Sequence, residues 1–219
     1  MVGTANYKIC WGVVMATINL HFGDSLAAMR AMPDQCYDLA IVDPPYGIKR
    51  AGHDKTHGWK FFEKKSWDNE IPPPEYFAEL RRVSKQQIIW GGNYFDLPPT
   101  RCILIWDKCQ YNLDMGDGEM AWTSFDRVMR IWAKNRCVLL QEGGTIHPTQ
   151  KPVALYQWCL EHFAKPGDRI LDTHLGSGSI AIACHNMGYD LDAWELDPEY
   201  HAAAVARFTQ HTQQLQLPW

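Results

Sequence analysis

Four consecutive residues that could do chemistry follow a short apolar stretch near the start of the chain: Asp43, Pro44, Pro45 and Tyr46. The stretch before them, 39–42, reads Leu-Ala-Ile-Val, which is typical of a buried parallel strand. Neither proline has a backbone N–H, so a central strand must end there. We therefore expect a carboxylate, backbone carbonyls and an aromatic ring at the carboxyl end of a strand, where open α/β sheets bind ligands.

A glycine-rich turn lies near the other end of the chain, between a predicted strand and a predicted helix. Gly176 and Gly178 permit a tight turn and the close approach of a ligand to the helix amides. Glu195 ends the next predicted strand, where an acid accepts hydrogen bonds from ribose hydroxyls, and Asp197 is the competing acid. Asp172 precedes the turn, and a carboxylate there would repel a pyrophosphate but accept bonds from an ammonium group. This unit predicts an adenosine-containing cofactor, and the zwitterionic end of S-adenosylmethionine suits it best.

The segment 48–73 has no regular pattern and interleaves basic with aromatic residues. Long loops inside a domain are usually functional or disordered, and this mixture suits phosphate binding and base stacking. The alternative is a solvated loop whose aromatic residues pin it to the core. The candidate phosphate ligands are Lys49, Arg50, Lys55, Lys60, Lys64 and Lys65.

Composition limits the class of protein. With 219 residues, one domain is expected, and the net charge of −4 means that any nucleic acid must bind a local basic patch. The seven cysteines form no C-x-x-C pair and are odd in number, which indicates reduced thiols in a cytoplasmic protein and no metal site. No apolar run approaches the roughly 18 residues of a membrane span, and the start of the chain lacks the pattern of a signal peptide.

Predicted strands alternate with predicted helices, which favours a doubly wound, mostly parallel sheet in an α/β fold. Segments 109–120 and 134–151 show no regular pattern. The strands are expected at 17–22, 38–42, 87–91, 102–106, 121–125, 127–133, 169–172 and 189–196, and the helices at 25–32, 74–83, 153–163, 179–187 and 198–210.

The sequence of residues 43–46 resembles the catalytic D-P-P-Y motif of the amino-group DNA methyltransferases, which methylate adenine N6 or cytosine N4. Residues 172–179 resemble their cofactor motif, D-P-F-x-G-S-G-T, although Thr173 and His174 replace the proline and the aromatic residue. Residues 147–152 resemble the family's H-P-T-x-K-P segment.

The order of the motifs is that of the permuted β group, in which the catalytic motif comes first and the cofactor motif last. The resemblance covers 17–210 and implies a single methyltransferase domain with the Rossmann-like fold of S-adenosylmethionine-dependent methyltransferases. The catalytic half is 17–133 and the cofactor half is 147–210, flanked by an extension at 1–16 and a tail at 211–219. Only 134–146 remain for a target-recognition region, so base-sequence readout must be short or relaxed, use segment 48–73, or come from a second subunit in a homodimer.

The resemblance also implies a role for each site residue. Asp43 and the carbonyl of Pro44 would hold the two N–H groups of the target amine, and Tyr46 would stack on a base flipped out of the duplex. The cofactor would be held by Asp24 at its adenine, Glu195 at its ribose and Lys151 near its carboxylate, with Asp172, Leu175, Gly176 and Gly178 forming the turn around it. For Asp24 the alternative is a helix cap, and for Lys151 a solvated surface lysine.

The function favoured by these motifs is methylation of adenine N6 in DNA, because cytosine-N4 enzymes more often carry serine at the position of Asp43. Cytosine N4 is the nearest alternative. A catalytically silent cofactor- or partner-binding module is the alternative of a different class. The short chain is typical of a phage or orphan methyltransferase, by analogy of fold alone.

Overall fold

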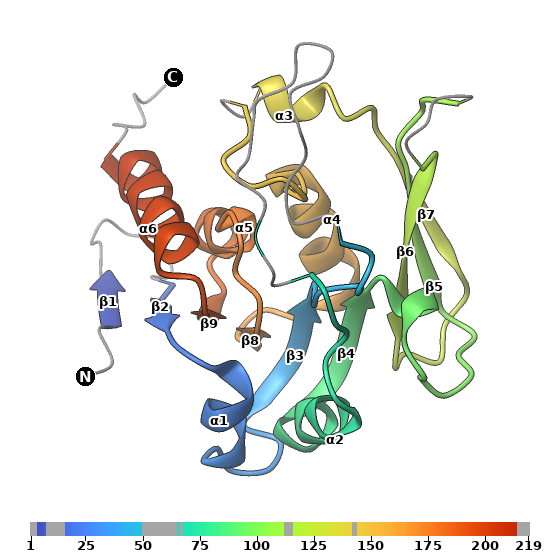
Figure 1. The fold of residues 1–219 in the computed structure, drawn as a ribbon, viewed down its shortest axis with the longest axis horizontal. Helices are drawn as coiled ribbons and strands as arrows, with labels where there is room; N and C mark the ends of the chain where they lie inside the picture. The colour runs from blue at the N-terminus through green and yellow to red at the C-terminus, as the bar shows by residue number, and fades with distance from the viewer. Residues whose placement is uncertain are drawn as a thin grey trace.

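The computed structural model describes residues 4–7, 16–49, 65, 68–111, 116–141 and 144–213. Within these residues the strands form one nine-stranded sheet in the order β1-β2-β9-β8-β3-β4-β6-β5-β7 (Figure 1). The strands are β1 Thr4–Tyr7, β2 Ile18–Phe22, β3 Tyr37–Val42, β4 Ser84–Trp90, β5 Ile103–Asp107, β6 Gly118–Thr123, β7 Arg130–Ala133, β8 Arg169–Asp172 and β9 Asp190–Glu195.

The central run from β2 to β4 is parallel throughout, whereas β6 enters antiparallel between β4 and β5. β1 pairs antiparallel with β2 at one edge, and β7 pairs parallel with β5 at the other. The predicted mostly parallel sheet is therefore confirmed. β8 leads to β9 on one side and β3 leads to β4 on the other, so the chain reverses its direction of travel between β3 and β8, which are hydrogen-bonded neighbours.

Helices cover both faces of the sheet, as the alternation of side chains along β3 requires. Leu39 and Ile41 join the core cluster that includes helices α4, α5 and α6, whereas Ala40 and Val42 join the cluster beneath α1 and α2 (Figure 1). This is the doubly wound fold expected from the sequence. The helices are α1 Ser25–Arg30, α2 Pro74–Val83, α3 Val138–Gln141, α4 Val153–Phe163, α5 Ser179–Met187 and α6 Pro198–Gln213, with a 3₁₀ turn η1 at Gly92–Tyr94.

Several predicted elements differ from the structure. The two strands expected at 121–125 and 127–133 exist as β6 and β7, but β5 lies between them in the sheet. The helix α3 falls in 134–151, where no pattern was visible, because it has four residues and too few turns to show periodicity. The extension at 1–16 contributes β1 to the sheet, and α6 continues three residues into the expected tail. No helix among the described residues has the length and apolar character needed to span a bilayer.

Candidate active site

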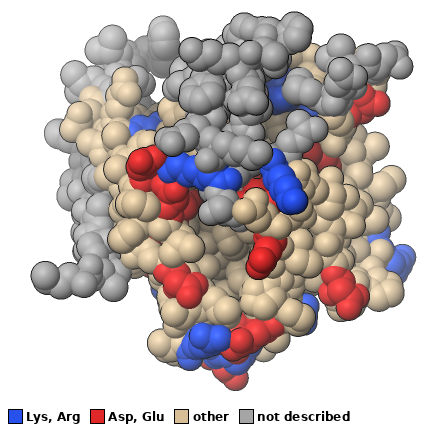
Figure 2. All heavy atoms as spheres, viewed as in Figure 1, with Lys and Arg blue, Asp and Glu red and all other residues tan. Residues whose placement is uncertain are grey.

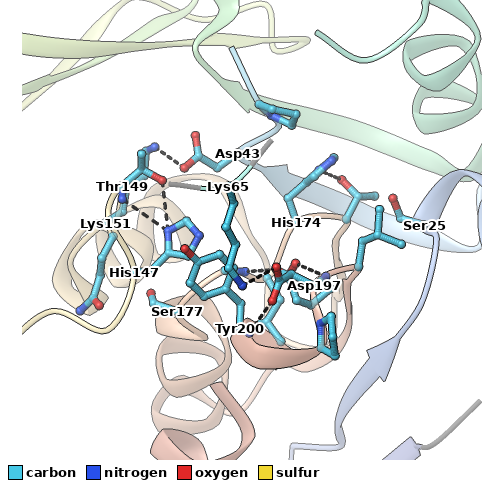
Figure 3. Close-up of a pocket in the computed structure, with 18 of the residues that line it drawn as sticks. Ser25, Asp43, Lys65, His147, Thr149, Lys151, His174, Ser177, Asp197 and Tyr200 are labelled. Carbon is cyan, nitrogen blue, oxygen red and sulfur yellow. Dashed lines mark hydrogen bonds and ion pairs between the residues drawn. The ribbon is translucent and has the colours of Figure 1, made fainter. Parts of the chain in front are cut away.

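A cavity of about 760 Å³ opens at the carboxyl ends of β2, β3, β8 and β9. Its position spans the point between β3 and β8 where the chain reverses direction, which is where open α/β sheets bind ligands. Its volume lies within the range typical of small-molecule sites. The lining includes Asp24 after β2, Asp43 and Pro45 after β3, 173–177 after β8, and Glu195 and Asp197 at and after β9. The segment 147–151 closes it from the side of α4 (Figure 3).

The turn after β3 is fixed by an aspartate that the sequence analysis did not single out. Asp68 is 3% exposed, and its Oδ1 accepts hydrogen bonds from the backbone N–H groups of Tyr46 and Gly47, at 2.8 and 3.0 Å. These donors cannot pair within the sheet, because the two prolines have already ended the strand. Asp68 therefore holds the turn that presents Asp43 and Tyr46.

The ring of Tyr46 packs between the backbone of Gly91 and the ring of Tyr94. It stacks on Tyr94, with ring centroids 4.9 Å apart and planes 13° apart, and its edge faces Phe95. Gly91 makes this possible, because a Cβ on that residue would lie 2.1 Å from Cε1 of Tyr46. Tyr94 is 43% exposed, so the aromatic pair reaches the surface beside the cavity.

Replacing Gly91 with alanine is expected to displace Tyr46 and reduce methyl transfer at least tenfold, an order-of-magnitude expectation for a misplaced positioning group. The left-handed backbone of Gly91, φ +70°, should also cost stability of about 1–2 kcal/mol. Gly167→Ala is the matched control, because Gly167 has φ +88° but open space at its Cβ. Thermal unfolding should fall in both variants, and transfer only in Gly91→Ala. Equal transfer by the two variants would contradict the role of the ring.

Asp43, Tyr46 and Lys151 form a closed ring of polar contacts. The Tyr46 hydroxyl donates to Asp43 Oδ1 at 2.6 Å, Lys151 Nζ lies 2.5 Å from Asp43 Oδ2, and the same ammonium donates to the Tyr46 hydroxyl at 3.2 Å. Burial raises the pKa of Asp43, while the charge of Lys151 opposes that effect. Because Lys151 stays charged, it favours the ionised form of the carboxylate, which accepts hydrogen bonds.

Lys151 has a second carboxylate partner, Glu119 on β6, whose Oε2 lies 3.1 Å from Nζ. Burial alone would lower the pKa of Lys151, but Asp43 and Glu119 outweigh it and raise the pKa above its ordinary value. Glu119 also pairs with Lys108 at 2.8 Å. Burial would raise the pKa of Glu119, but these two lysines lower it to about 2. Lys151 lines the cavity, so its expected contact with a cofactor carboxylate stays a prediction. Its side chain is 2% exposed, which rules out a solvated surface lysine, and its three N–H donors face Asp43, Glu119 and Tyr46.

The glycine-rich turn and Glu195 come together as the sequence predicts. Gly176 N donates to Glu195 Oε2 at 2.8 Å, and Asp197 N donates to Oε1 at 2.9 Å, so the carboxylate is held by two amides while it lines the cavity. Burial raises the pKa of Glu195, and the backbone donors oppose it. Gly176 and Leu175 also line the cavity. A carboxylate so fixed can accept the two hydroxyls of a ribose, since each oxygen has a further lone pair.

Two residues of the turn lie elsewhere than expected. Asp172 is 2% exposed and is not among the described residues that line the cavity; its Oδ1 accepts the amide of His174 at 2.9 Å. Burial raises the pKa of Asp172 to about 8. Gly178 begins α5 with φ +74° and faces Ala204 of α6, whose Cβ would lie 3.3 Å from an added Cβ. Asp172 and Gly178 flank the cavity-lining residues 173–177 and therefore shape the turn from its two ends.

Asp24 is the predicted helix cap and also lies at the cavity, while its contact with the adenine of a cofactor stays a prediction. Its Oδ1 caps α1 by accepting from Leu26 N at 2.9 Å, and its residue lines the cavity at the same time. His147 lies at the opposite wall, where it contacts Thr149 and packs edge-on to Tyr200 (Figure 3). Burial lowers the pKa of His147 to about 3, so its imidazole is neutral.

Lys65 lies at the cavity and is engaged with acids. Its ammonium lies 2.6 Å from Asp197 Oδ2 and 2.7 Å from Glu199 Oε2, and it sits 4.4 Å from the ring centre of Tyr200 (Figure 3). The expectation that Lys65 binds DNA phosphate stays a prediction, and in this structure two carboxylates compensate its charge. Asp197 also caps α6 by accepting from Glu199 N and Tyr200 N.

Lys49 is exposed, whereas Arg50, Lys55, Lys60 and Lys64 lie outside the described residues. On the face drawn in Figure 2, the coloured basic and acidic side chains are interspersed, in keeping with the net charge of −4. Among the described residues, no group of three or more histidine, cysteine or acidic side chains is arranged to hold a metal ion.

The fold of the chain is that of the S-adenosylmethionine-dependent methyltransferases. Its fold matches the M1.HpyAVI–S-adenosylmethionine complex with a TM-score of 0.59 and 20% identity, covering 87% of this chain and 99% of that one. The PvuII cytosine-N4-specific DNA methyltransferase matches with a TM-score of 0.58 and 14% identity over 92% and 88% of the two chains.

Sequence comparison finds similarity to DNA methylases. A family model described as DNA methylase matches residues 105–206. The DNA adenine methyltransferase YhdJ of Escherichia coli (strain K12) is 24% identical over 84% of this chain and 80% of its own length. These similarities support an amino-group DNA methyltransferase, of the kind that modifies adenine N6 or cytosine N4.

Proposed function

We propose that this enzyme methylates the N6 amine of adenine in DNA, with Asp43 as the acceptor that holds the amine. One observation carries the proposal: the Asp43 carboxylate and the Glu195 carboxylate line the same cavity, from β3 and β9 respectively. An amine acceptor and a ribose acceptor are thus presented to one space. S-adenosylmethionine, when bound there, supplies a methyl group already activated by the positive sulfonium.

The main task of the protein in this reaction is to orient the target amine toward the methyl group. An exocyclic amine is a weak nucleophile, because its lone pair is delocalised into the ring. Asp43 and the carbonyl of Pro44 can accept its two N–H bonds and let the nitrogen become pyramidal, and Asp43 can take the proton that the amine loses. Such positioning accounts for a large share of the rate of a bimolecular reaction.

Each oxygen of Asp43 already has one partner, and the amine can be received by exchange of one of them. Its Oδ1 accepts the Tyr46 hydroxyl and its Oδ2 faces Lys151. The hydroxyl is the partner that exchanges more easily, because it carries no charge. The amine N–H then takes the place of the hydroxyl at Oδ1, and Tyr46 keeps its ring for stacking on the base.

Adenine is favoured over cytosine by the residue at position 43. The resemblance associates serine at this position with cytosine-N4 enzymes, and this chain has aspartate. Similarity to YhdJ, named a DNA adenine methyltransferase, supports adenine, whereas the likeness to the PvuII cytosine-N4 enzyme concerns the fold. Cytosine N4 is therefore the second candidate.

The proposed assignment is tested by transfer of a tritiated methyl group from S-adenosylmethionine to unmethylated DNA, followed by digestion and nucleoside chromatography. We expect label in N6-methyldeoxyadenosine. Label in N4-methyldeoxycytidine would establish the second candidate instead. Binding of the cofactor without label in any nucleoside would overturn both.

A further inference from the structure

A chain of alternating charges leads from the end of β5, near one edge of the sheet, to Asp43 at the end of the central strand β3. Lys108 follows β5 and lies 2.8 Å from Glu119 on β6; Glu119 lies 3.1 Å from Lys151; and Lys151 lies 2.5 Å from Asp43. The side chains of Lys108 and Lys151 are 9% and 2% exposed. Charges are buried in this way at a desolvation cost that only good pairing offsets.

We propose that Glu119 and Lys108 are positioning residues for methyl transfer, because together they hold the Lys151 ammonium against Asp43. Neither belongs to the described residues that line the cofactor cavity, whereas Lys151 and Asp43 both do. The two act through Lys151 and touch neither the base nor the cofactor. This inference rests on the proposed role of Asp43 as the acceptor of the amine.

The geometry of Lys151 explains why Glu119 is needed. An ammonium has three N–H donors, and those of Lys151 face Asp43, Glu119 and Tyr46. When the amine displaces the Tyr46 hydroxyl from Asp43, the contacts of that hydroxyl change. Glu119 is the partner that this exchange leaves untouched. It therefore keeps Lys151, and with it the Oδ2 side of Asp43, in place while the base enters.

Charge balance gives a second reason. The four side chains that form this series of ion pairs carry two positive and two negative charges, so their net charge is zero. The amine gains positive charge as it attacks the methyl group. Without the Glu119 carboxylate, the cluster beside the amine would carry an excess positive charge, which would disfavour the transition state.

The pH dependence of transfer should report this coupling. The groups around Asp43 come from β6, α2, α4, the end of β8 and the segment before α4. Of these groups, Glu119 and Lys151 carry charge at neutral pH. Burial keeps the others neutral, because it raises the pKa of the three tyrosines and of Asp172, the latter to about 8, and lowers the pKa of the His147 imidazole to about 3. The full set is Lys151, Glu119, Tyr46, Tyr76, Tyr156, Asp172 and His147.

The sign of the pH shift follows from Coulomb's law. Glu119 is a negative neighbour that raises the pKa of Asp43, so its removal should lower that pKa and move the acid limb of the kcat profile to lower pH, by about one unit. Removal of the Lys108 cation should move the acid limb in the opposite direction. A role confined to packing would produce neither shift.

The test compares Glu119→Gln, Glu119→Asp and Lys108→Met with the wild type. We expect Glu119→Gln to lower kcat by about 10- to 100-fold, with a much smaller change in the affinity for S-adenosylmethionine measured by calorimetry. Glu119→Asp, which keeps the charge, should recover part of kcat. Glu79→Gln is the matched control, because Glu79 is 20% exposed against 26% for Glu119 and pairs with Arg82 on α2.

A readout independent of activity is the pKa of Lys151, followed by the ¹³Cε resonance of labelled lysine and assigned by its loss in Lys151→Met. We expect this pKa to fall in Glu119→Gln and to stay unchanged in Glu79→Gln. If an active wild type and Glu119→Gln share the same kcat and acid limb, or if cofactor affinity falls as much as kcat, the positioning role is overturned. If the folded wild type binds cofactor but transfers no methyl group to DNA, the proposed function falls, and the positioning role falls with it.

Discussion

Replacing Asp43 with alanine is expected to lower kcat for methyl transfer by about 100- to 1000-fold, the range seen when one preorganised polar group is removed from a reacting centre. The carboxylate is the acceptor proposed to orient the amine and to take its proton. The cofactor site should survive, because Glu195 is held by backbone amides of Gly176 and Asp197 that do not involve Asp43. Tritiated methyl transfer and calorimetric titration with S-adenosylmethionine separate the two effects.

Asp38→Ala is the control for this variant, because Asp38 lies on the same strand, β3, at the end remote from the cavity, where it pairs with Lys85. It should transfer methyl groups at the wild-type rate. Asp43→Asn adds a second comparison, since the amide keeps one acceptor oxygen but loses the ion pair with Lys151. Near-wild-type transfer by Asp43→Ala would overturn the mechanism; loss of both transfer and cofactor binding in a folded protein would assign Asp43 to the cofactor instead.

The parts of the site that could be predicted from the sequence are those whose functional residues lie close together in the chain. Asp43 and its two prolines indicate the end of a strand, because the residues that stop the strand are neighbours in the sequence. Gly176 and Glu195 indicate a nucleotide-binding turn, because both belong to one βαβ unit. The burial of β3 on both faces could likewise be predicted, because residues 39–42 form a continuous apolar run.

The residues that hold these groups could not be predicted in this way. Glu119 reaches Lys151 only because β6 enters the sheet antiparallel next to β4, a pairing that no local pattern specifies. Asp68 lies in a stretch of mixed composition, where nothing marks it as the acceptor for two backbone amides. In each case the role of the residue depends on a contact with a residue that lies tens of positions away in the sequence.

The partners of two lysines likewise depend on contacts between distant segments. Lysine beside a cofactor motif suggests a carboxylate ligand, yet Lys151 meets the two carboxylates of the protein itself. Lys65 sits in a basic segment, yet its nearest acids lie at the start of α6. The residue type predicts the kind of partner correctly, whereas the identity of that partner depends on the folded arrangement.

Replacing Lys151 with methionine is expected to have the second large effect, on stability as well as on activity. It removes the buried cation shared by Asp43 and Glu119 and leaves two carboxylates, 15% and 26% exposed, near one another. Breaking a fully buried ion pair costs about 3–5 kcal/mol, and partial exposure makes this an upper bound. The free energy of unfolding should fall by up to that amount in chemical denaturation at pH 7. Part of the loss should return as the pH is lowered, because Asp43 and Glu119 then take up protons and their repulsion disappears. Methyl transfer should be lost at every pH.

Two further variants separate repulsion between the carboxylates from simple loss of packing around Lys151. Glu119→Gln combined with Lys151→Met removes one of the two orphaned charges, so this double variant should be more stable than Lys151→Met alone and still inactive. Lys85→Met removes a lysine whose side chain is 53% exposed and paired with Asp38, and it should leave both unfolding and transfer unchanged. If the double variant proves no more stable than Lys151→Met, the cost comes from packing, and the buried charge chain is not what stabilises the catalytic turn.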